Sequence, residues 1–425
     1  MAAQPEQLSI LSFEEARAVV EDHASRLRPR GRELLDLLDA HGRVLAEPIH
    51  ADRDFPPFPR ATRDGYAVRA TDLEKPAELR IIGEIRAGGV PSSIRVQPGD
   101  AAIIMTGAPV PEGADAVVMI EHTARSGNRV HVTRRIAQHE NIVATGAEAK
   151  RGDKLLAPGV RVGYAEIAIA ASVGRSRLLV HAKPRIAVLS TGDEVVDIDV
   201  PPGPNQIRNS NSYSLAAQIQ TAGGEPVILP IAPDEPSRLR ELLLEGLDAD
   251  LLLITGGVSM GKYDLVEQAL AELKAEFFFT GAQIQPGKPV VFGRVPCGTA
   301  SCGAGALARE GSEHKYFLGL PGNPISTMVT FELFAKAMLE ALAGKLHRQL
   351  TFTYAKLKSE IRTKTGLKRF LPAILSGQFE HAELELVGWH GSGDIAAVAR
   401  ANCYAVIPPD RERIEAGEWV PVLLR

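Results

Sequence analysis

The feature that most constrains the fold is an apolar run that ends in two glycines, in the segment LLLITGGVSMGKYD. Residues 251–254 are too few to span a membrane, and they indicate a strand buried on both faces, as in parallel sheets. Gly256 and Gly257 place no Cβ between their backbone N–H groups and a ligand. Helix-forming sequence follows from about Tyr263. The segment therefore predicts either a plain tight turn or an anion-binding turn at the carboxyl edge of a sheet.

Two other segments repeat this arrangement of strand, turn and polar residues. KPRIAVLSTGDE at 183–194 and YFLGLPGNPIST at 316–327 each run from an apolar strand into a glycine-centred turn, and the second continues into a helix through Ala343. Helical patterns between the strands, which would form the crossovers of a doubly wound sheet, cover 212–222, 236–247 and 265–274. Neither a GxGxxG fingerprint nor a Walker loop is present, so the classical dinucleotide and P-loop classes are excluded.

Length and composition narrow the class of protein. A chain of 425 residues suggests about three domains, and 45% hydrophobic with 24% charged residues is typical of globular proteins. The net charge of −4 does not indicate the basic surface that binding to nucleic acid or to an acidic membrane requires. No signal-peptide pattern and no spanning apolar run is found. The cysteines form neither a disulfide framework nor a zinc pattern, so we expect a cytoplasmic protein; they are Cys297, Cys302 and Cys403.

The amino-terminal region predicts two helices. Ser12 and Glu15 form a capping box, and an apolar helical face follows. A second short helix is expected at about 33–45. The apolar face of the first helix needs a partner surface, which either the same chain or another subunit supplies.

The next region is rich in β-forming runs. The proline-rich stretch 52–69 is either a solvated linker or a loop that presents charge to a site. Residues 77–162 alternate short β runs with Gly and Pro, which predicts an all-β module. Thr106 lies in a loop that is either a β-turn or a ligand contact. A helix is expected at 164–171.

Polar loops follow within and after the α/β region. Ser210 or Asn211 is expected to cap the next helix or to bind a phosphate, and Asp234 to cap the helix after it. Lys288 lies in a turn before a strand. The loop 297–315 is rich in Gly, Ala and Ser, and we assign it no chemistry. Short β runs in 349–425 predict a small barrel or a sandwich.

Carboxylates gather in the sequence near the expected sheet edge. Asp193, Glu194, Asp234 and Asp264 all follow or adjoin its turns. Hard cations such as Mg²⁺ prefer carboxylate oxygens and share phosphate ligands. The residues therefore predict a metal-assisted site for a phosphate-bearing ligand or an oxyanion. No nucleophile elbow, Ser/His/Asp order or HExxH motif competes with this interpretation.

A set of motifs taken together resembles one known family. The motifs, in chain order, are DGYAVR at Asp64, MTGAPVP around Thr106, STGDE at Thr191, TGGVSMG with Asp264, QPGKP at Lys288 and LPGNPIS at Pro321. The chain is similar over nearly its whole length to the molybdopterin molybdenumtransferases, which are the bacterial MoeA proteins and relatives such as the gephyrin E-domain.

The resemblance implies a multidomain α/β plus β fold and an elongated homodimer. A central doubly wound α/β domain would resemble molybdopterin adenylyltransferase, accompanied by a β-rich insert domain, an elongated dimerisation domain and a carboxyl-terminal β-barrel. The implied ranges are 8–50 with 145–182 for the elongated domain, 51–144 for the β-rich domain, 183–345 for the α/β domain and 346–425 for the barrel.

The implied reaction is the Mg²⁺-dependent insertion of molybdate into adenylylated molybdopterin, with release of AMP. By motif, the metal and active-site acids are Glu194, Asp234 and Asp264, while Asp64 and Thr106 reach the cleft from the partner subunit. The implied substrate-binding residues are Thr191, Gly192, Gly256, Gly257, Ser259, Lys288, Pro321, Gly322, Asn323, Pro324, Arg369 and Ser392. Protein partners would be an adenylyltransferase and molybdoenzyme-maturation proteins.

Two departures and two alternatives accompany the resemblance. Gln285 stands where the family often has lysine, so oxyanion binding would depend more on Lys288 and Arg369, and the 297–315 loop is longer than expected. An adenylyltransferase would lack the flanking β modules. A non-catalytic scaffold would not need the acids, which are intact here. The sequence does not distinguish molybdate from tungstate.

Overall fold

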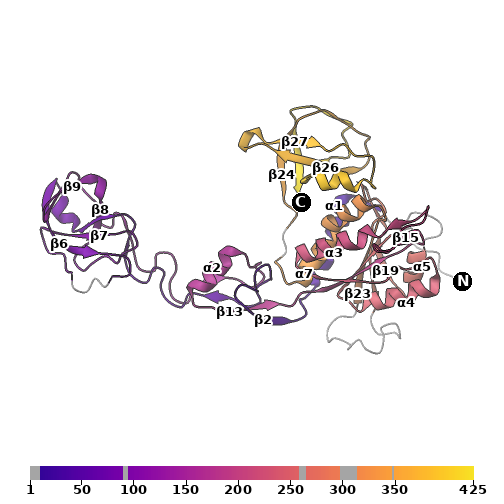
Figure 1. Cartoon of the computed structure of the whole chain (residues 1–425), viewed down its shortest axis with the longest axis horizontal. Helices are drawn as coiled ribbons and strands as arrows, with labels where there is room; N and C mark the ends of the chain where they lie inside the picture. The colour runs from indigo at the N-terminus through magenta and orange to yellow at the C-terminus, as the bar shows by residue number, and fades with distance from the viewer. Residues whose placement is uncertain (1–9, 90–93, 258–264, 297–313, 347–348) are drawn as a thin grey trace.

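The computed structural model describes residues 10–89, 94–257, 265–296, 314–346 and 349–425. The molecule is elongated, with a β-rich unit at one end and the α/β and carboxyl-terminal units at the other (Figure 1). A slender middle unit connects them, and the chain passes through it on the way out and on the way back. No helix in these described ranges is long and apolar enough to cross a membrane.

The α/β unit is built on a six-stranded sheet with strand order β17-β14-β18-β23-β22-β19. The first four are mutually parallel, and β22 and β19 complete the sheet in antiparallel fashion. Their bounds are β14 (Arg185–Ser190), β17 (Glu225–Ile228), β18 (Leu251–Thr255), β19 (Glu276–Phe279), β22 (Val291–Pro296) and β23 (His314–Leu320). Every residue of β18 is buried, as the apolar run predicts.

Helices cover both faces of this sheet. The core on one face contains residues of α1 (Phe13–Arg26), α3, α6 and α7 together with Ile186 and Leu253. The core on the other face contains residues of α4 and α5 together with Leu189 and Ile254. The helices of the unit are α3 (Ser210–Ala222), α4 (Pro236–Leu247), α5 (Leu265–Glu272), α6 (Pro324–Thr330) and α7 (Lys336–Leu342). The predicted doubly wound α/β fold is confirmed.

Two capping predictions are wrong. Helix α3 is capped by Asn209, whose side chain accepts from the Ser212 N–H, and not by Ser210 or Asn211. Helix α4 has Glu235 at its N-cap position without a side-chain cap, so Asp234 does not cap it. Pro at the first helical position explains the second case, because Pro removes one of the N–H groups that need a partner.

The helix expected from Pro324 onward is interrupted by a π-helical segment, η4 (Phe331–Ala335). A wider turn disturbs the regular hydrogen bonding of a helix. The side chain of Arg17 donates to Leu333 O and that of Gln218 to Met328 O, so residues outside the helix satisfy carbonyls at and before the segment.

Helix α1 (Phe13–Arg26) begins with the predicted capping box between Ser12 and Glu15. Its apolar face packs on α7 and enters the core of the α/β unit. The sequence left open whether this apolar face packs on the same chain or on another subunit. In the structure it packs on the same chain.

The predicted helix at 33–45 is wrong. Residues Arg32–Asp36 form β2, which pairs antiparallel with β13 (Arg177–His181), and turns follow to residue 42. The local sequence favours a helix, but pairing with a distant strand overrides that propensity. The middle unit also contains β3 (Ile49–His50), β12 (Lys154–Leu156) and α2 (Tyr164–Ser172), of which α2 confirms the helix predicted at 164–171.

The β-rich unit is a six-stranded sheet of order β8-β5-β7-β6-β10-β9. Its strands are β5 (Gly65–Val68), β6 (Ala77–Ile85), β7 (Asp100–Ile104), β8 (Ala116–Met119), β9 (Thr123–Ser126) and β10 (Arg129–Val132). The described residues of 77–162 form strands, turns and a short 3₁₀ segment, so the predicted all-β character is confirmed.

The carboxyl-terminal unit is a closed barrel, because β26 pairs with both β27 and β28 while β24 and β30 complete the ring. A barrel rather than a sandwich is therefore observed. The strands are β24 (Phe352–Leu357), β26 (Lys368–Ser376), β27 (Glu383–Leu386), β28 (Cys403–Ile407) and β30 (Trp419–Leu424), and α8 (Ile395–Arg400) precedes β28. The sequence prediction missed β26, in which Pro372 argues against a strand.

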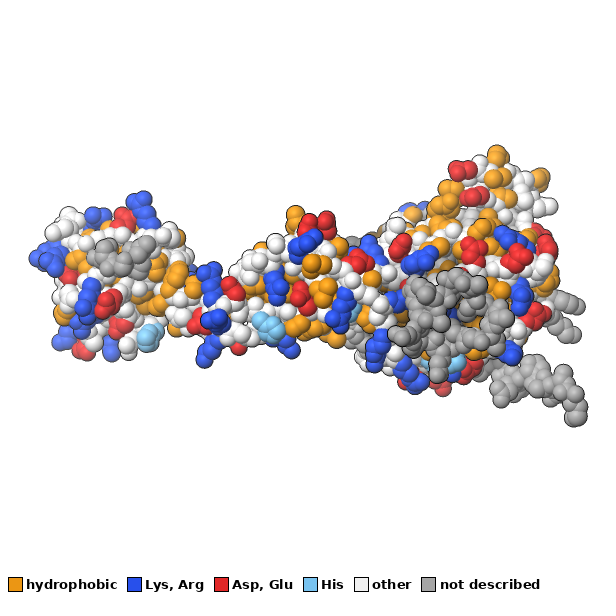
Figure 2. All heavy atoms as spheres, turned by 90° about the horizontal axis from the view of Figure 1, so that it is seen from below, with side chains coloured by type: hydrophobic (Ala, Val, Ile, Leu, Met, Phe, Trp, Pro, Cys, Tyr) orange, Lys and Arg blue, Asp and Glu red, His pale blue; other side chains and the backbone are white. Residues whose placement is uncertain are grey.

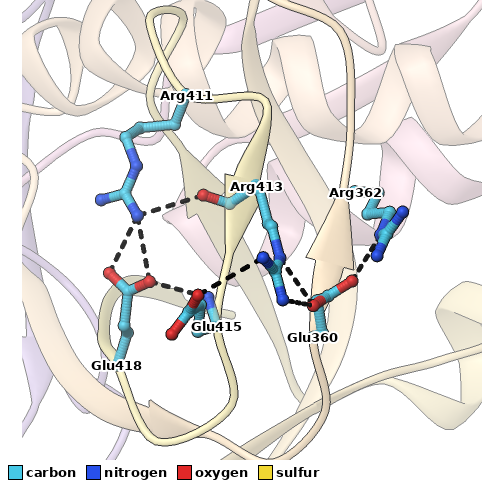
Figure 3. A network of polar contacts seen from close by, with 6 residues as sticks. All are labelled: Glu360, Arg362, Arg411, Arg413, Glu415 and Glu418. Atoms are coloured by element: carbon cyan, nitrogen blue, oxygen red, sulfur yellow. Dashed lines mark hydrogen bonds and ion pairs between the residues drawn. The ribbon is translucent and has the colours of Figure 1, made fainter.

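An ion-pair network joins two short strands of this barrel unit, β25 (Ile361–Arg362) and β29 (Arg413–Ile414) (Figure 3). Glu360 accepts from both Arg362 and Arg413, and these two guanidinium groups lower the pKa of its carboxyl. Arg411 pairs with Glu418 nearby. Exposed pairs of this kind stabilise modestly, so the network adds little to the stability of the barrel core.

Candidate active site at the carboxyl edge of the α/β sheet

Three turns converge at one edge of the α/β sheet. Ser190, Thr255 and Leu320 are the last residues of β14, β18 and β23, and the parallel register places them opposite one another. Backbone hydrogen bonds continue this alignment into the turns, from Thr191 N to Thr255 O (3.1 Å) and from Gly256 N to Leu320 O (3.3 Å). The predicted residues Thr191 and Gly256 therefore lie in neighbouring turns.

The glycines of β18's turn are required by this close approach. Gly256 and Gly257 have φ values of +87° and +61°. Residues with a side chain rarely adopt such positive values, whereas glycine adopts them readily. A Cβ on Gly256 would lie 2.7 Å from Thr191 O, and one on Gly257 would lie 2.7 Å from Thr191 Oγ1. Packing between turns is thus sufficient to explain both glycines, whatever the edge binds.

Polar side chains of α3 and α6 form hydrogen bonds with the turns. Asn211 Nδ2 donates to Thr255 Oγ1 (2.9 Å) and to Gly322 O (2.7 Å), and so connects the turn after β18 with the turn after β23. Thr327 donates to Pro321 O and to Asn323 O from helix α6. Thr255 and Thr327 could not be predicted to take part in these hydrogen bonds, because a hydroxyl at a strand end or in a helix carries little signal alone.

Two buried polar atoms at this edge lack a hydrogen-bond partner within the described residues: Thr191 Oγ1 and Asn211 Oδ1. Buried polar atoms in native proteins nearly always have partners. A hydroxyl can donate to an oxyanion and a carboxamide oxygen can accept from an amine or a hydroxyl. Both atoms therefore suit contacts with a bound polar molecule.

Acidic side chains lie at the β14 side of the edge. Glu194 and Asp234 are exposed, and the Asp193 carboxylate accepts from Asp234 N at 3.1 Å, which ties the two acidic loops together. The predicted Ser259 and Asp264 lie outside the described residues. No group of three His, Cys, Asp or Glu in the described part of the chain is arranged to hold a metal ion. Glu194 and Asp234 supply the oxygen donors that hard cations prefer.

Two basic residues lie in segments beside this edge, Lys288 in the turn before β22 and Arg369 in barrel strand β26. Strand β22 runs antiparallel to β23 and begins opposite Gly319, which places the Lys288 turn near the end of β23. Gln285 lies opposite Arg369 across the pairing of β21 (Ile284–Gln285) with barrel strand β26. Arg369 is only 7% exposed, and burial lowers its pKa, although a guanidinium stays protonated in proteins.

The barrel contributes a second predicted residue. Ser392 O accepts from Ile325 N at 3.0 Å, so the Gly-Ser-Gly-Asp turn of the barrel lies against the start of α6. Asn323 and Pro324 form that start. The barrel thus places both Arg369 and Ser392 beside turns of the α/β unit.

Asp64 and Thr106 form a pair of their own. The Asp64 carboxylate accepts from the backbone N–H and from the hydroxyl of Thr106, both at 2.7 Å. These hydrogen bonds lower the pKa of Asp64. The pair is exposed on the β-rich unit, at the opposite end of the molecule from the α/β unit (Figure 1). Within one chain, therefore, the structure does not bring these residues to the sheet edge.

Comparison with known proteins agrees with this architecture. Residues 11–174 match the MoeA N-terminal region (domain I and II), 187–341 the probable molybdopterin binding domain, and 354–424 the MoeA C-terminal region (domain IV). The crystal structure of the molybdopterin biosynthesis moeA protein from Pyrococcus horikoshii OT3 superposes with a TM-score of 0.76 at 28% identity, covering 98% of this chain and 100% of that one. Fold and site together define a MoeA-type protein of molybdenum cofactor biosynthesis.

Curated sequences narrow the class further. The molybdopterin molybdenumtransferase of Nostoc sp. is 35% identical over 92% of this chain and 88% of its own length. That of Bacillus subtilis is 32% identical over 92% and 89%. The chain belongs to the molybdopterin molybdenumtransferase family and is a transferase, as the motifs indicated. The adenylyltransferase alternative does not account for the matched regions on both sides of the α/β unit.

Proposed function

We propose that this enzyme inserts molybdate into adenylylated molybdopterin and releases AMP, with Mg²⁺ as cofactor. The proposal is supported by the convergence of three turns at one sheet edge, and by the pairing that sets Arg369 opposite Gln285, three residues before Lys288. Both molybdate and the adenylylated pterin are anionic, so cationic side chains and backbone N–H groups stabilise their approach.

The acids at the β14 side of the edge would hold the cation. Glu194 and Asp234 are exposed carboxylates of neighbouring loops, and Asp264 would complete the set by its motif. A Mg²⁺ ion held by these acids would supply positive charge against the phosphates of the pterin. Lys288, Arg369 and the turn amides orient the anions, and Thr191 and Ser392 provide further polar contacts.

A homodimer would complete the site. Asp64 and Thr106 lie at the far end of their own chain, and a two-fold axis through the middle unit would carry them to the partner's sheet edge. The middle unit exposes the apolar side chains that such an interface needs, with Leu38 77% and Tyr164 88% exposed. Figure 2 shows hydrophobic side chains among the charged ones along this unit.

Two further expectations belong to the same proposal. An adenylyltransferase would supply the activated pterin, and maturation proteins would receive the product. A cytoplasmic location suits the free thiol of Cys403, whose burial raises its pKa to about 11.

The test uses mixed dimers of two variants, Asp64→Asn and Glu194→Gln. Each variant alone should form no cofactor from adenylylated molybdopterin and molybdate. In random mixtures, half of the dimers are mixed and each has one intact site, so about a quarter of the wild-type activity should return. Mixed dimers that form but stay inactive would contradict a site shared between subunits, and variants that retain full activity alone would contradict the residue assignment.

A further inference from the structure

We infer that Phe13, at the start of helix α1, is a positioning residue for Arg369. It holds barrel strand β26 against the α/β unit, so that the guanidinium is presented to the anion site. This inference rests on the proposed function, because it takes Arg369 to be a contact for molybdate.

Phe13 lies at the junction of the two units. Its ring centroid is 5.3 Å from that of Phe370 in β26 and 6.2 Å from that of Phe334 in η4. All three rings are buried in one core. Tilted aromatic pairs at these separations are favourable beyond the area that they bury. One side chain of α1 is therefore packed between the barrel and the α/β unit.

The residues on either side of Arg369 are both held by the first turn of α1. Side chains at Lys368 and Phe370 share one face of β26, and Arg369 points to the other. The Lys368 ammonium lies 5.0 Å from the centroid of the Phe13 ring and also pairs with Glu14. The position of Arg369 relative to the α/β unit thus depends on contacts made by its two neighbours in the strand.

The backbone provides a second connection between the same segments. Strand β1 (Ile10–Leu11), just before α1, pairs with β20 (Gly281–Ala282), and Leu11 O accepts from Gln283 N at 2.8 Å. Gln283 O in turn accepts from Lys368 N at 3.0 Å. The amino-terminal segment, the chain that leads to the Lys288 turn, and β26 therefore form a continuous hydrogen-bonded array.

Arg369 has little to orient it otherwise. In the described part of the chain, its guanidinium donates to Leu367 O at 3.1 Å. A guanidinium carries five N–H donors, so this bond leaves most of them for a ligand. The location of the strand, and not a network around the side chain, decides where the charge lies. Displacement of a binding group by about 1 Å can cost on the order of a hundredfold in rate.

The experiment compares Phe13→Ala with Val20→Ala in the full-length enzyme. Val20 is buried in the same core, two turns further along α1, so its truncation controls for loss of packing. We expect Phe13→Ala to raise the KM for molybdate about tenfold, with a smaller change in kcat, and Val20→Ala to leave that KM unchanged. Hydrogen exchange at the Lys368 amide should accelerate only in Phe13→Ala.

Equal effects of both truncations on melting temperature, with an unchanged KM in each, would overturn the inference. Should Phe13→Ala fail to fold, Phe13→Leu and Lys368→Met test the same contacts with less loss of volume. Each should raise the KM for molybdate by a smaller factor, and an unchanged KM in both would overturn the inference.

Arg369→Ala separates this inference from the proposed function. It should raise the KM for molybdate, and adding Phe13→Ala should raise it no further, because the group that Phe13 positions is then gone. A normal KM in Arg369→Ala would remove the anion role and the inference together. A raised KM in Arg369→Ala with a normal KM in Phe13→Ala would overturn the inference alone, as would additive effects in the double variant.

Discussion

At the scale of residues, the sheet edge depends on small polar groups as much as on charges. The carboxamide of Asn211 connects two turns, and the Thr327 hydroxyl donates hydrogen bonds to carbonyl oxygens of the Pro321 turn. Such groups hold backbone in place without adding charge. The charged residues around them, Glu194 and Lys288, are therefore free to contact ligands, and their substitution should affect chemistry more than folding.

Glu194→Gln should melt nearly like the wild type and form cofactor poorly. The side chain is exposed, and surface substitutions of this kind usually change the free energy of unfolding by within about 0.5 kcal/mol. The measurements are melting temperature and turnover across a Mg²⁺ titration, with Glu272→Gln on α5 as an exposed control. Normal turnover at limiting Mg²⁺ would show that Glu194 is not a metal ligand.

Thr106→Val should raise the pKa of Asp64 toward its ordinary value. The largest cause of the lowered pKa is the backbone N–H of Thr106, which remains in the variant, and the second is the hydroxyl, which is lost. Because the folded pKa is lowered, Asp64 contributes stability above its ordinary pKa of 3.8, and this is lost as the pH falls through the folded value. Carboxyl titration by NMR, from pH 2 to about 6, measures the shift. An unchanged pKa would mean that the hydroxyl makes no hydrogen bond in solution.

At the scale of elements, the helix after the Pro321 turn shows how the units are joined. Its π-helical segment η4 contains Phe334, whose ring packs against that of Phe13, and Leu333, whose carbonyl oxygen accepts a hydrogen bond from Arg17 of α1. Gln218 of α3 donates to Glu332 in the same segment. A regular helix would present different side chains and carbonyls to α1, so the irregular turn determines how α1 packs.

Arg17→Met should lower the free energy of unfolding by about 1–3 kcal/mol, because a buried carbonyl then loses its partner. Arg26→Met at the exposed end of the same helix should cost less than about 1 kcal/mol, since its ion pair with Asp22 is exposed. Urea unfolding of both variants measures the difference. Equal destabilisation would indicate that the Leu333 carbonyl finds water or another donor.

At the scale of the whole molecule, the elongated shape separates two halves of the proposed site. The Asp64–Thr106 pair and the α/β edge lie in units at opposite ends. In the proposed homodimer a second copy brings them together, while the middle unit keeps its own core of Leu45, Ile49 and Leu178.

Leu38→Asp in the middle unit should convert the proposed homodimer to monomers and abolish activity. A charge buried without a partner is strongly unfavourable, whereas the same change in a free monomer is exposed and cheap. Sedimentation at micromolar concentration measures the state, with Tyr354→Asp as the control, since Tyr354 is exposed on the barrel instead. A wild-type monomer with full activity would exclude the homodimer.

Much of the fold could be predicted from local pattern. The buried strand β18, helix α4 and the capping box of α1 each depend on neighbours in sequence, through hydrophobic run length, period and side-chain reach. The predicted helix at 33–45 failed because β2 is stabilised by a strand more than a hundred residues away. Strand β26 was missed because Pro372 argues against a strand, and only the pairing with the distant strands β27 and β28 shows that one forms there.

By itself, the sequence determined the family, the order of its units and the turns that end β14, β18 and β23, because motifs and periodicity are local properties of the chain. Tertiary structure alone decided which of the predicted residues meet. The parallel register aligned Thr191 with Gly256, and the pairing of β21 with β26 brought Arg369 beside the Lys288 turn. Asp64 lies on the β-rich unit, which is at the opposite end of the molecule from these residues. Convergence of residues distant in sequence follows from strand pairing and packing between units, and no local pattern encodes it.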